Sequence, residues 1–240
     1  MENIKGLVLK SINYKESSKI IYVYTKTGLR SILIHGNNKM KNRYLNISRT
    51  LNYISVFATG KDLLTFRDGD IVNGYRKIAD SLDKYTYSTH ICELVYSFSS
   101  HDHDHEKLLS FLLKILDIVN DELDYIPYLN MIELKLLYLL GINPMFKHCV
   151  SCNKTDNLVF SISEGGYCCQ EHIKNPDRFT EVTLNYIKFL YYFDLASDKM
   201  IEIDQSNLKQ IRIFLDRYYA YHQNIKTNSR KLLMGLIGYW

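Results

Sequence analysis

The strongest constraint on the fold is a change of sequence pattern near residue 80. Between Ile4 and Tyr75, short runs rich in β-branched and aromatic residues alternate with turn-forming sequences rich in Gly, Asn and Asp. The turns recur about every 10 residues, which is typical of short antiparallel strands. After Asp80 the apolar residues recur with the period of a helix instead. The pattern therefore predicts an α+β chain with a β-rich front segment and a helical second segment.

The front segment has the length of a five-stranded oligonucleotide-binding barrel, or OB-fold. A small barrel with another connectivity fits the same periodicity, so the pattern alone leaves these two architectures open. We expect residues 1–79 to form the barrel domain and residues 80–240 to form a helical C-terminal domain. The second domain carries a loop insert at residues 146–178, between two of its predicted helices.

Two segments of the second domain each place apolar residues on one helical face. These residues are Leu108, Leu112, Ile115, Leu116 and Val119 in one segment, and Met131, Leu134, Leu137 and Leu140 in the other. Gly141 suits a helix C-cap. Thr180–Leu195 and Ser206–His222 show helical spacing too, with Ser206 as a candidate N-cap. The patch His101–His105 fits a solvated loop whose aspartates begin the next helix, and metal binding is the alternative.

Positive charge is concentrated at the front of the chain. Residues 1–79 hold 14 Lys and Arg against 5 Asp and Glu, whereas the net charge of the whole chain is only +4. Between Glu16 and Asp62 there is no acidic residue. This asymmetry favours a polyanionic partner for the front domain. A solvated basic face with no ligand is the alternative interpretation.

Aromatic residues are interleaved with these cations, and a basic groove with exposed ring faces is the usual means of binding single strands without reading sequence. The cations of the loop that follows Gly36 are the best candidates for phosphate contacts, because a Gly- and Asn-rich connection cannot be core. For any single tyrosine, core packing is the competing interpretation. The candidate DNA-binding residues are Lys19, Arg30, Lys39, Lys41, Arg43, Tyr44 and Arg49.

The strongest local motif is Cys149-x2-Cys152, followed after 16 residues by Cys169-x2-His172. Two ligands separated by two residues bend the backbone around one ion, and two such knuckles complete a tetrahedral zinc site. We therefore predict that Cys149, Cys152, Cys169 and His172 bind one structural Zn²⁺. Cys168 forms a possible second pair with His172, but the tighter spacing favours Cys169. Two reduced knuckles without metal are the alternative.

The sequence gives no candidate catalytic residue. A site closed by four protein ligands has no open position at which zinc could activate water, and the His-x-Glu motif of the zinc deaminases is missing. Neither a G-x-x-x-x-G-K-[ST] phosphate loop nor a G-x-S-x-G nucleophile elbow occurs. We therefore expect a non-enzymatic protein; an open zinc site would restore a hydrolase or deaminase.

The N-terminal sequence lacks the basic start and apolar run of a secretory signal, and no apolar stretch reaches the roughly 20 residues of a membrane span. We therefore expect a cytoplasmic protein with no membrane partner. In the reducing cytosol, clustered cysteines favour metal binding over disulfides.

These features together resemble the RecO family of bacterial recombination mediators. The opening GLVLKSINYKESSKIIYVYTKTGLRSILIHG is similar to the family's first three strands, with its Tyr-x-Glu-Ser turn. LKLLYLLGINPMFKHCVSC matches the Leu-Gly-Pro-Cys run of the family, and FSISEGGYCCQEH matches its second knuckle. The similarity covers essentially the whole chain, in order. His172 stands where many members have Cys, which zinc accepts equally well.

The resemblance implies an N-terminal OB-fold, a helical domain with a zinc loop, and annealing of complementary strands without ATP. It implies a role in DNA repair and homologous recombination through the RecF pathway, in which RecA is loaded on strands coated by single-stranded-DNA-binding protein. The implied partners are single-stranded DNA, RecR and the acidic, hydrophobic C-terminal tail of single-stranded-DNA-binding protein, in the bacterial nucleoid. The alternative function is a zinc-loop adaptor for protein interaction whose basic front serves only solubility.

Overall fold

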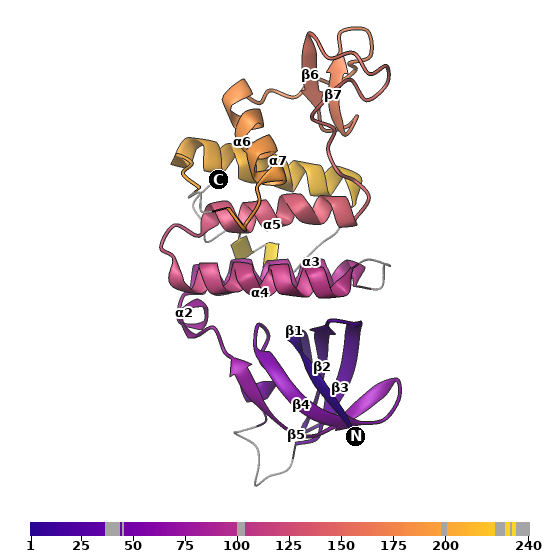
Figure 1. Cartoon of the computed structure of the whole chain (residues 1–240), viewed down its shortest axis with the longest axis vertical. Coiled ribbons are helices and arrows are strands. Elements are labelled where there is room, and N and C mark those ends of the chain that lie inside the picture. Colours follow the sequence, from indigo (N-terminus) through magenta and orange to yellow (C-terminus); the bar gives the residue numbers. More distant parts are fainter. Residues whose placement is uncertain are drawn as a thin grey trace. The chain divides into compact units, whose positions relative to one another are not determined.

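The computed structural model describes residues 1–36, 44, 46–99, 104–197, 201–223, 229, 230, 232 and 233. Its first five strands close into a barrel in the order β1-β2-β3-β5-β4, and only β3 and β5 run parallel to each other (Figure 1). The strands are β1 Glu2–Tyr14, β2 Ser18–Thr25, β3 Gly28–Ile34, β4 Tyr53–Thr59 and β5 Leu63–Asn73. This connectivity is that of the OB-fold, so the structure decides between the two architectures that the sequence left open.

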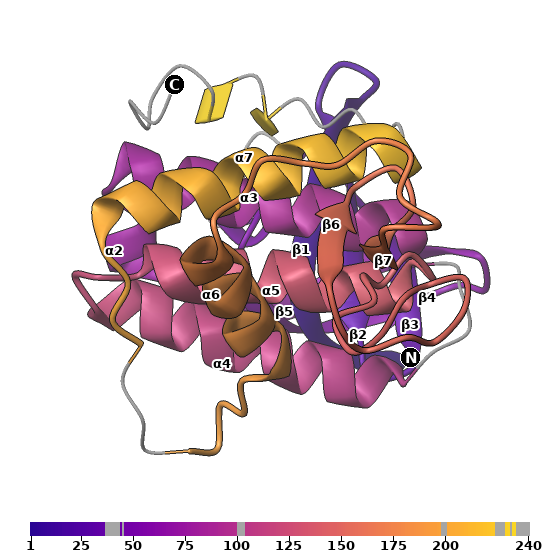
Figure 2. The same cartoon turned by 90° about the horizontal axis from the view of Figure 1, so that it is seen from above.

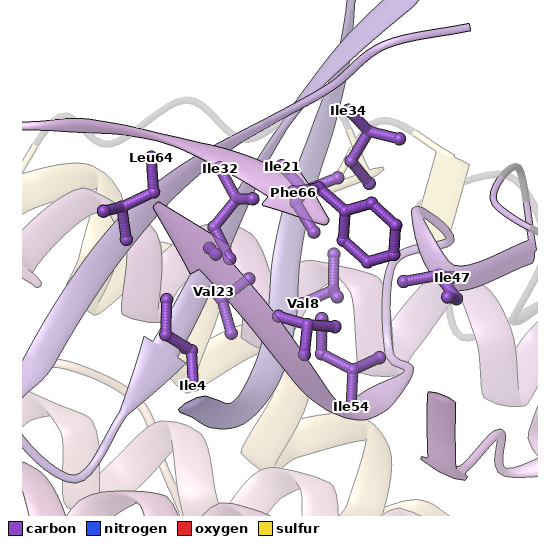
Figure 3. Close-up of a cluster of buried hydrophobic side chains, with 12 residues drawn as sticks. Ile4, Val8, Ile21, Val23, Ile32, Ile34, Ile47, Ile54, Leu64 and Phe66 are labelled. Atoms are coloured by element: carbon purple, nitrogen blue, oxygen red, sulfur yellow. The ribbon is translucent and has the colours of Figure 1, made fainter. Parts of the chain in front are cut away.

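The interior of the barrel is filled by apolar side chains from all five strands, most of them isoleucine and valine (Figure 3). Alternate residues of each strand point inward, so Ile21 of β2 faces the core beside its cross-strand partner Ile32 of β3. Both are fully buried. Each such side chain contributes about 1.5–3 kcal/mol on burial, and closure leaves the barrel with no unpaired edge strand.

The outer face of β1 and β2 is also covered, in this case by helices of the same unit. Leu7, Leu9 and Tyr24 point outward from the barrel and are fully buried. The hydroxyl of Tyr24 hydrogen-bonds Nδ1 of His105 at 2.9 Å. The ring of Tyr22 packs edge-on against Tyr96, which lies in the helix Leu82–Phe98. These strands therefore carry apolar residues on both faces.

The chain forms two compact units. The first spans Met1–Leu123 and includes the described residues from Ser229 to Leu233; the second spans Asp124 to the end of the last helix. Helices α2 (Arg76–Ala79), α3 (Leu82–Phe98) and α4 (His105–Asp121) thus belong to the same unit as the barrel. The boundary expected between residues 79 and 80 stays a prediction.

Helix α4 confirms the first predicted apolar face, because all five of its predicted residues are buried. Asp104 is its N-cap and accepts a hydrogen bond from the backbone N–H of Lys107 at 2.9 Å, so an aspartate of the histidine patch does begin this helix. Residues 101–103 of that patch lie outside the described part of the chain.

The second unit contains α5 (Ile126–Leu139), the short strands β6 (Leu158–Ser161) and β7 (Gly166–Cys169), α6 (Glu181–Tyr192) and α7 (Gln205–His222). Helix α6 packs against both α5 and α7 (Figure 2). The N-cap of α7 is Asp204, so the assignment of this role to Ser206 was wrong.

Gly141 ends α5 as predicted. Its φ of 69° is left-handed, its N–H bonds the carbonyl of Tyr138 at 3.0 Å, and the N–H of Ile142 bonds that of Leu137 at 3.0 Å. This pair of bonds is a Schellman motif, which favours glycine. It turns the chain toward the cysteine-rich loop.

None of the described helices has the length and apolar character needed to cross a membrane.

Candidate metal centre and nucleic-acid surface

The cysteine-rich loop is organised by a three-stranded backbone arrangement around β7. The segment after Met145 runs beside β7: Tyr167 N–H bonds the carbonyl of Met145 at 3.0 Å, and Val150 N–H bonds that of Tyr167 at 2.9 Å. Gly166 lies so close to Met145 that an added Cβ would sit 2.6 Å from its carbonyl oxygen. These contacts bring the first knuckle against the second.

Each knuckle is a tight turn closed by its own backbone. In the first, the N–H of Asn153 bonds the carbonyl of Cys149 at 3.1 Å, and Asn153 has the left-handed φ of 62° that asparagine tolerates. In the second, the N–H of His172 bonds the carbonyl of Cys169 at 3.0 Å. Asn153 therefore allows the tight turn that the first knuckle needs.

The donor atoms of Cys149, Cys152, Cys169 and His172 all lie within 4.8 Å of one another. The sulfurs of Cys152 and Cys169 are 3.6 Å apart, and Nδ1 of His172 lies 3.2 Å from the sulfur of Cys169 and 3.8 Å from that of Cys149. Two sulfurs that are each about 2.3 Å from a tetrahedral ion lie about 3.8 Å apart. The spacing and the donor chemistry both fit a metal ion, so the structure brings together all four residues predicted as ligands.

The electrostatics of the cluster also favour a bound cation. Burial raises the pKa of the Cys149 thiol, but N–H donors from Cys169, Ser151 and Cys152 outweigh burial and lower it to about 6. A backbone N–H from Lys154 lowers the pKa of Cys152, yet burial and the neighbouring thiols raise it overall. The thiolate that this pKa favours at Cys149 would be stabilised by a cation between the donor atoms.

Cys168 points away from this cluster. Consecutive residues of a strand face opposite sides, and Cys169 of β7 faces the other ligands. Burial raises the pKa of the Cys168 thiol, which keeps it protonated. The preference for Cys169 as the member of the knuckle therefore agrees with the geometry.

An aromatic cluster anchors the loop to the helices of its unit. Phe146 stacks on Phe160 of β6 with ring centroids 5.8 Å apart, and it contacts Tyr191 of α6 at 5.7 Å. Phe160 in turn contacts Phe214 of α7 at 5.4 Å. Sequence periodicity could not show this cluster, because its members come from four separate elements.

The candidate DNA-binding residues of the barrel do not form one cluster. Lys19 lies opposite Ile34, and Arg30 lies opposite Val23 on the same pair of strands. Four residue steps, about 13 Å at roughly 3.3 Å per residue, separate the two cations along the ribbon. The guanidinium of Arg30 is paired with Glu2 at 2.6 Å, so its charge is partly balanced.

The remaining candidates fall into three groups. Tyr44 is half-buried and its ring packs against Phe66 of the barrel core at 4.9 Å, as the competing interpretation of core packing expects. Arg49 is exposed, with its guanidinium 5.5 Å from the ring centroid of Tyr85. Lys39, Lys41 and Arg43 lie outside the described residues.

Sequence reasoning missed an apolar row on the outside of the barrel. Ile12, Ile20 and Leu33 are adjacent in register on β1, β2 and β3, and none of them is fully buried. The row borders Lys19 and the end of β3, from which the chain continues into the basic loop after Gly36. The strand pattern marked these residues as apolar, but only the register places them side by side.

The fold and the site define an OB-fold protein with helices and a Cys₃His cluster of zinc-binding type. Family models for the N-terminal part of recombination protein O match residues 1–75, and those for its C-terminal part match residues 79–231. The chain therefore belongs to the RecO family, whose role is in DNA repair and recombination.

Curated relatives agree with this assignment over nearly the full chain. The chain is 25% identical to DNA repair protein RecO of Halalkalibacterium halodurans, with 95% of this chain and 92% of that protein aligned. It is 26% identical to DNA repair protein RecO of Bacillus cytotoxicus, with 97% of this chain and 96% of that protein aligned.

Proposed function

We propose that this chain is a non-enzymatic mediator of homologous recombination that binds single-stranded DNA and anneals complementary strands without ATP. In this role it helps to load RecA on strands coated by single-stranded-DNA-binding protein, in the RecF pathway. The observation that carries the proposal is the closed OB-fold barrel at the front of a RecO-family chain, with its excess of positive charge. OB-folds bind single strands on a basic groove that tracks the backbone.

The proposed path of the strand follows the part of the barrel that the helices leave uncovered. It crosses the apolar row of Ile12, Ile20 and Leu33, against which bases can pack. It then passes Lys19 toward the loop that contains Lys39, Lys41 and Arg43, which would contact phosphates. The ion pair of Arg30 and the core packing of Tyr44 make these two residues the weakest members of the set.

The metal in this proposal is one Zn²⁺ held by Cys149, Cys152, Cys169 and His172, and its role is structural. When bound, zinc would supply folding free energy to the loop, because four protein ligands leave no position for water or substrate. The support is the donor set and the spacing of its four ligand atoms.

The proposed partners, besides single-stranded DNA, are RecR and the C-terminal tail of single-stranded-DNA-binding protein. Both rest on membership of the family. We place the protein in the bacterial cytoplasm, associated with the nucleoid.

The test is fluorescence anisotropy of a labelled oligo-dT with the full chain between 50 and 200 mM salt, a range chosen because phosphate contacts weaken steeply across it. The proposal predicts a log–log slope of about −0.7 per phosphate contact. The variant K39A/K41A/R43A should flatten that slope by about 2. The matched control K107A/K174A/K209A removes three exposed cations of the helices and loop and should leave the slope unchanged.

The second candidate function is a zinc-loop adaptor for protein interaction. It is favoured by the concentration of exposed side chains around the loop, such as Val150, which is 36% exposed. An adaptor would give no salt-dependent binding of oligo-dT, so the same titration decides between the two functions.

A further inference from the structure

The ends of helices α5 and α6 and the segment before the first knuckle lie close together in the second unit. Lys135 of α5 donates from Nζ to the carbonyl of Tyr191 at 2.9 Å, which satisfies one of the free carbonyls at the end of α6. Tyr138 lies one helical turn after Lys135 and therefore on the same side of α5. Lys147, which precedes the first knuckle, has its Nζ 5.9 Å from the ring centroid of Tyr192, the last residue of α6.

Two tyrosine rings are presented to solvent here. Tyr138 is 67% exposed and Tyr192 is 51% exposed, whereas Tyr191 is half-buried and contacts Tyr192 edge-on at 4.9 Å. Burial first, and then Tyr192 and Tyr138, raise the pKa of the Tyr191 phenol, in keeping with the proximity of all three rings. Exposed aromatic rings are normal when scattered singly, but a group of them next to a lysine is a binding feature.

A groove opens beside Tyr192 along α6. It has a volume of about 540 Å³, which is within the range of ligand pockets. Phe189 and Phe193 line it together with Lys188 and one acid, Asp194. Lys147 lies near the ring of Tyr192, which lines the groove, so Lys147 and Lys188 outnumber the one acid, Asp194.

We propose that Tyr138, Tyr192, Lys147 and Lys188 form a second binding site for unpaired single-stranded DNA, separate from the barrel. The rings of the tyrosines stack on bases, and the two lysines contact phosphates. This inference rests on the proposed function, because a protein that anneals two strands must hold both at once. Stacking is favoured over recognition of a peptide because the exposed groups are planar faces with cations beside them.

The experiment uses the full chain and two oligo-dT strands, one with a donor and one with an acceptor fluorophore, so that energy transfer reports two strands on one protein. The variant Y138A/Y192A should weaken capture of the second strand about 5- to 150-fold per lost stacked base, with the first strand bound within about 2-fold of the parent. Tyr221→Ala, a residue of α7 that is 62% exposed, is the matched control and should leave both strands bound.

A second measurement identifies the residues directly. Oligo-dT carrying 5-iodouracil should photocrosslink to Tyr138 or Tyr192 once the barrel site of K39A/K41A/R43A is weakened. Equal capture of both strands by Y138A/Y192A, or crosslinks only elsewhere, would overturn the second site while leaving the barrel site standing. Failure of the unaltered chain to bind any oligo-dT would overturn the proposed function and this inference together. Binding of an acidic, apolar peptide is measured as well. If Y138A/Y192A lost this binding but still bound both strands, the surface would be a protein site and the inference would be overturned.

Discussion

The barrel and the cysteine-rich loop are stabilised in opposite ways. The barrel has five strands in a closed ring of hydrogen bonds around apolar side chains, most of them isoleucine and valine. The loop has two strands of four residues each, and its chemistry lies in four ligand atoms within 4.8 Å of one another. An isolated two-stranded hairpin is marginal in water, so the loop needs support that the barrel does not.

The barrel and the loop should therefore be destabilised by different substitutions. The barrel should respond to core volume and be indifferent to metal, because hydrophobic burial and strand pairing stabilise it without the four ligands. The loop should respond to its ligands and to the aromatic cluster that joins Phe146, Phe160 and Phe214. Variants confined to one region should therefore leave the other intact.

Among these substitutions, replacement of a zinc ligand should destabilise the loop most. Cys152→Ser should abolish zinc content and unfold the loop, because structural zinc contributes on the order of 10 kcal/mol to folding in small zinc domains. Hydrogen exchange should become fast for β6 and β7 while the barrel amides stay protected. The control Cys168→Ala should keep its zinc, since this residue faces away from the ligands. Retained zinc in Cys152→Ser would contradict the ligand assignment.

The helices beneath the loop depend on a buried ion pair. Glu133 of α5 and Arg212 of α7 are 0% and 6% exposed, and their side chains meet at 2.5 Å. Arg212→Met should cost about 3–5 kcal/mol, because it removes the guanidinium that pairs with the buried carboxylate of Glu133 and with Asp216. Urea denaturation measures this loss. The double variant E133L/R212M should recover much of it, and equal destabilisation of the single and double variants would show that the pair matters only through packing.

A cavity in the barrel core tests whether the stability of the barrel is independent of the metal centre. Ile32→Ala removes a fully buried side chain from the core and should cost about 2–5 kcal/mol. Zinc content, measured by mass spectrometry of the intact protein, should not change. A variant that loses zinc together with barrel stability would show that the two regions are coupled.

The smallest expected effect falls on the turn between α5 and the loop. Gly141→Ala introduces a Cβ with no heavy atom within 4 Å, so its cost is only that of the left-handed backbone, about 1 kcal/mol. Thermal unfolding should show a shift of a few degrees. A much larger shift would indicate that this turn sets the geometry of the metal centre.

Much of the fold could be predicted because local patterns agree with the final architecture. The turn spacing of the front segment predicted its strands, and the five buried residues of α4 followed from helical periodicity. The connectivity of the barrel did not follow from the pattern alone, because it depends on the parallel pairing of β3 with β5, which are separated by β4 in the sequence. The burial of Tyr24 was also out of reach, since its partner His105 is 81 residues away.

The grouping of the four candidate metal ligands was predictable because its information is local, with two ligands in each knuckle. The position of the proposed nucleic-acid surface was not predictable, because it depends on register and on which strand faces the helices cover. Lys19 and Arg30 are only 11 positions apart in the sequence, yet the register places them about four residues apart along neighbouring strands, at roughly 3.3 Å per residue. Pattern alone also could not show that Arg30 is paired with Glu2.

Strand annealing without ATP is the decisive test of the proposed mediator function. Two complementary labelled strands, coated with the single-stranded-DNA-binding protein of the same organism, are mixed with and without this chain. We expect faster annealing that requires the C-terminal tail of the coating protein and is lost in K39A/K41A/R43A. No acceleration, together with no binding of uncoated strands, would contradict the proposed function.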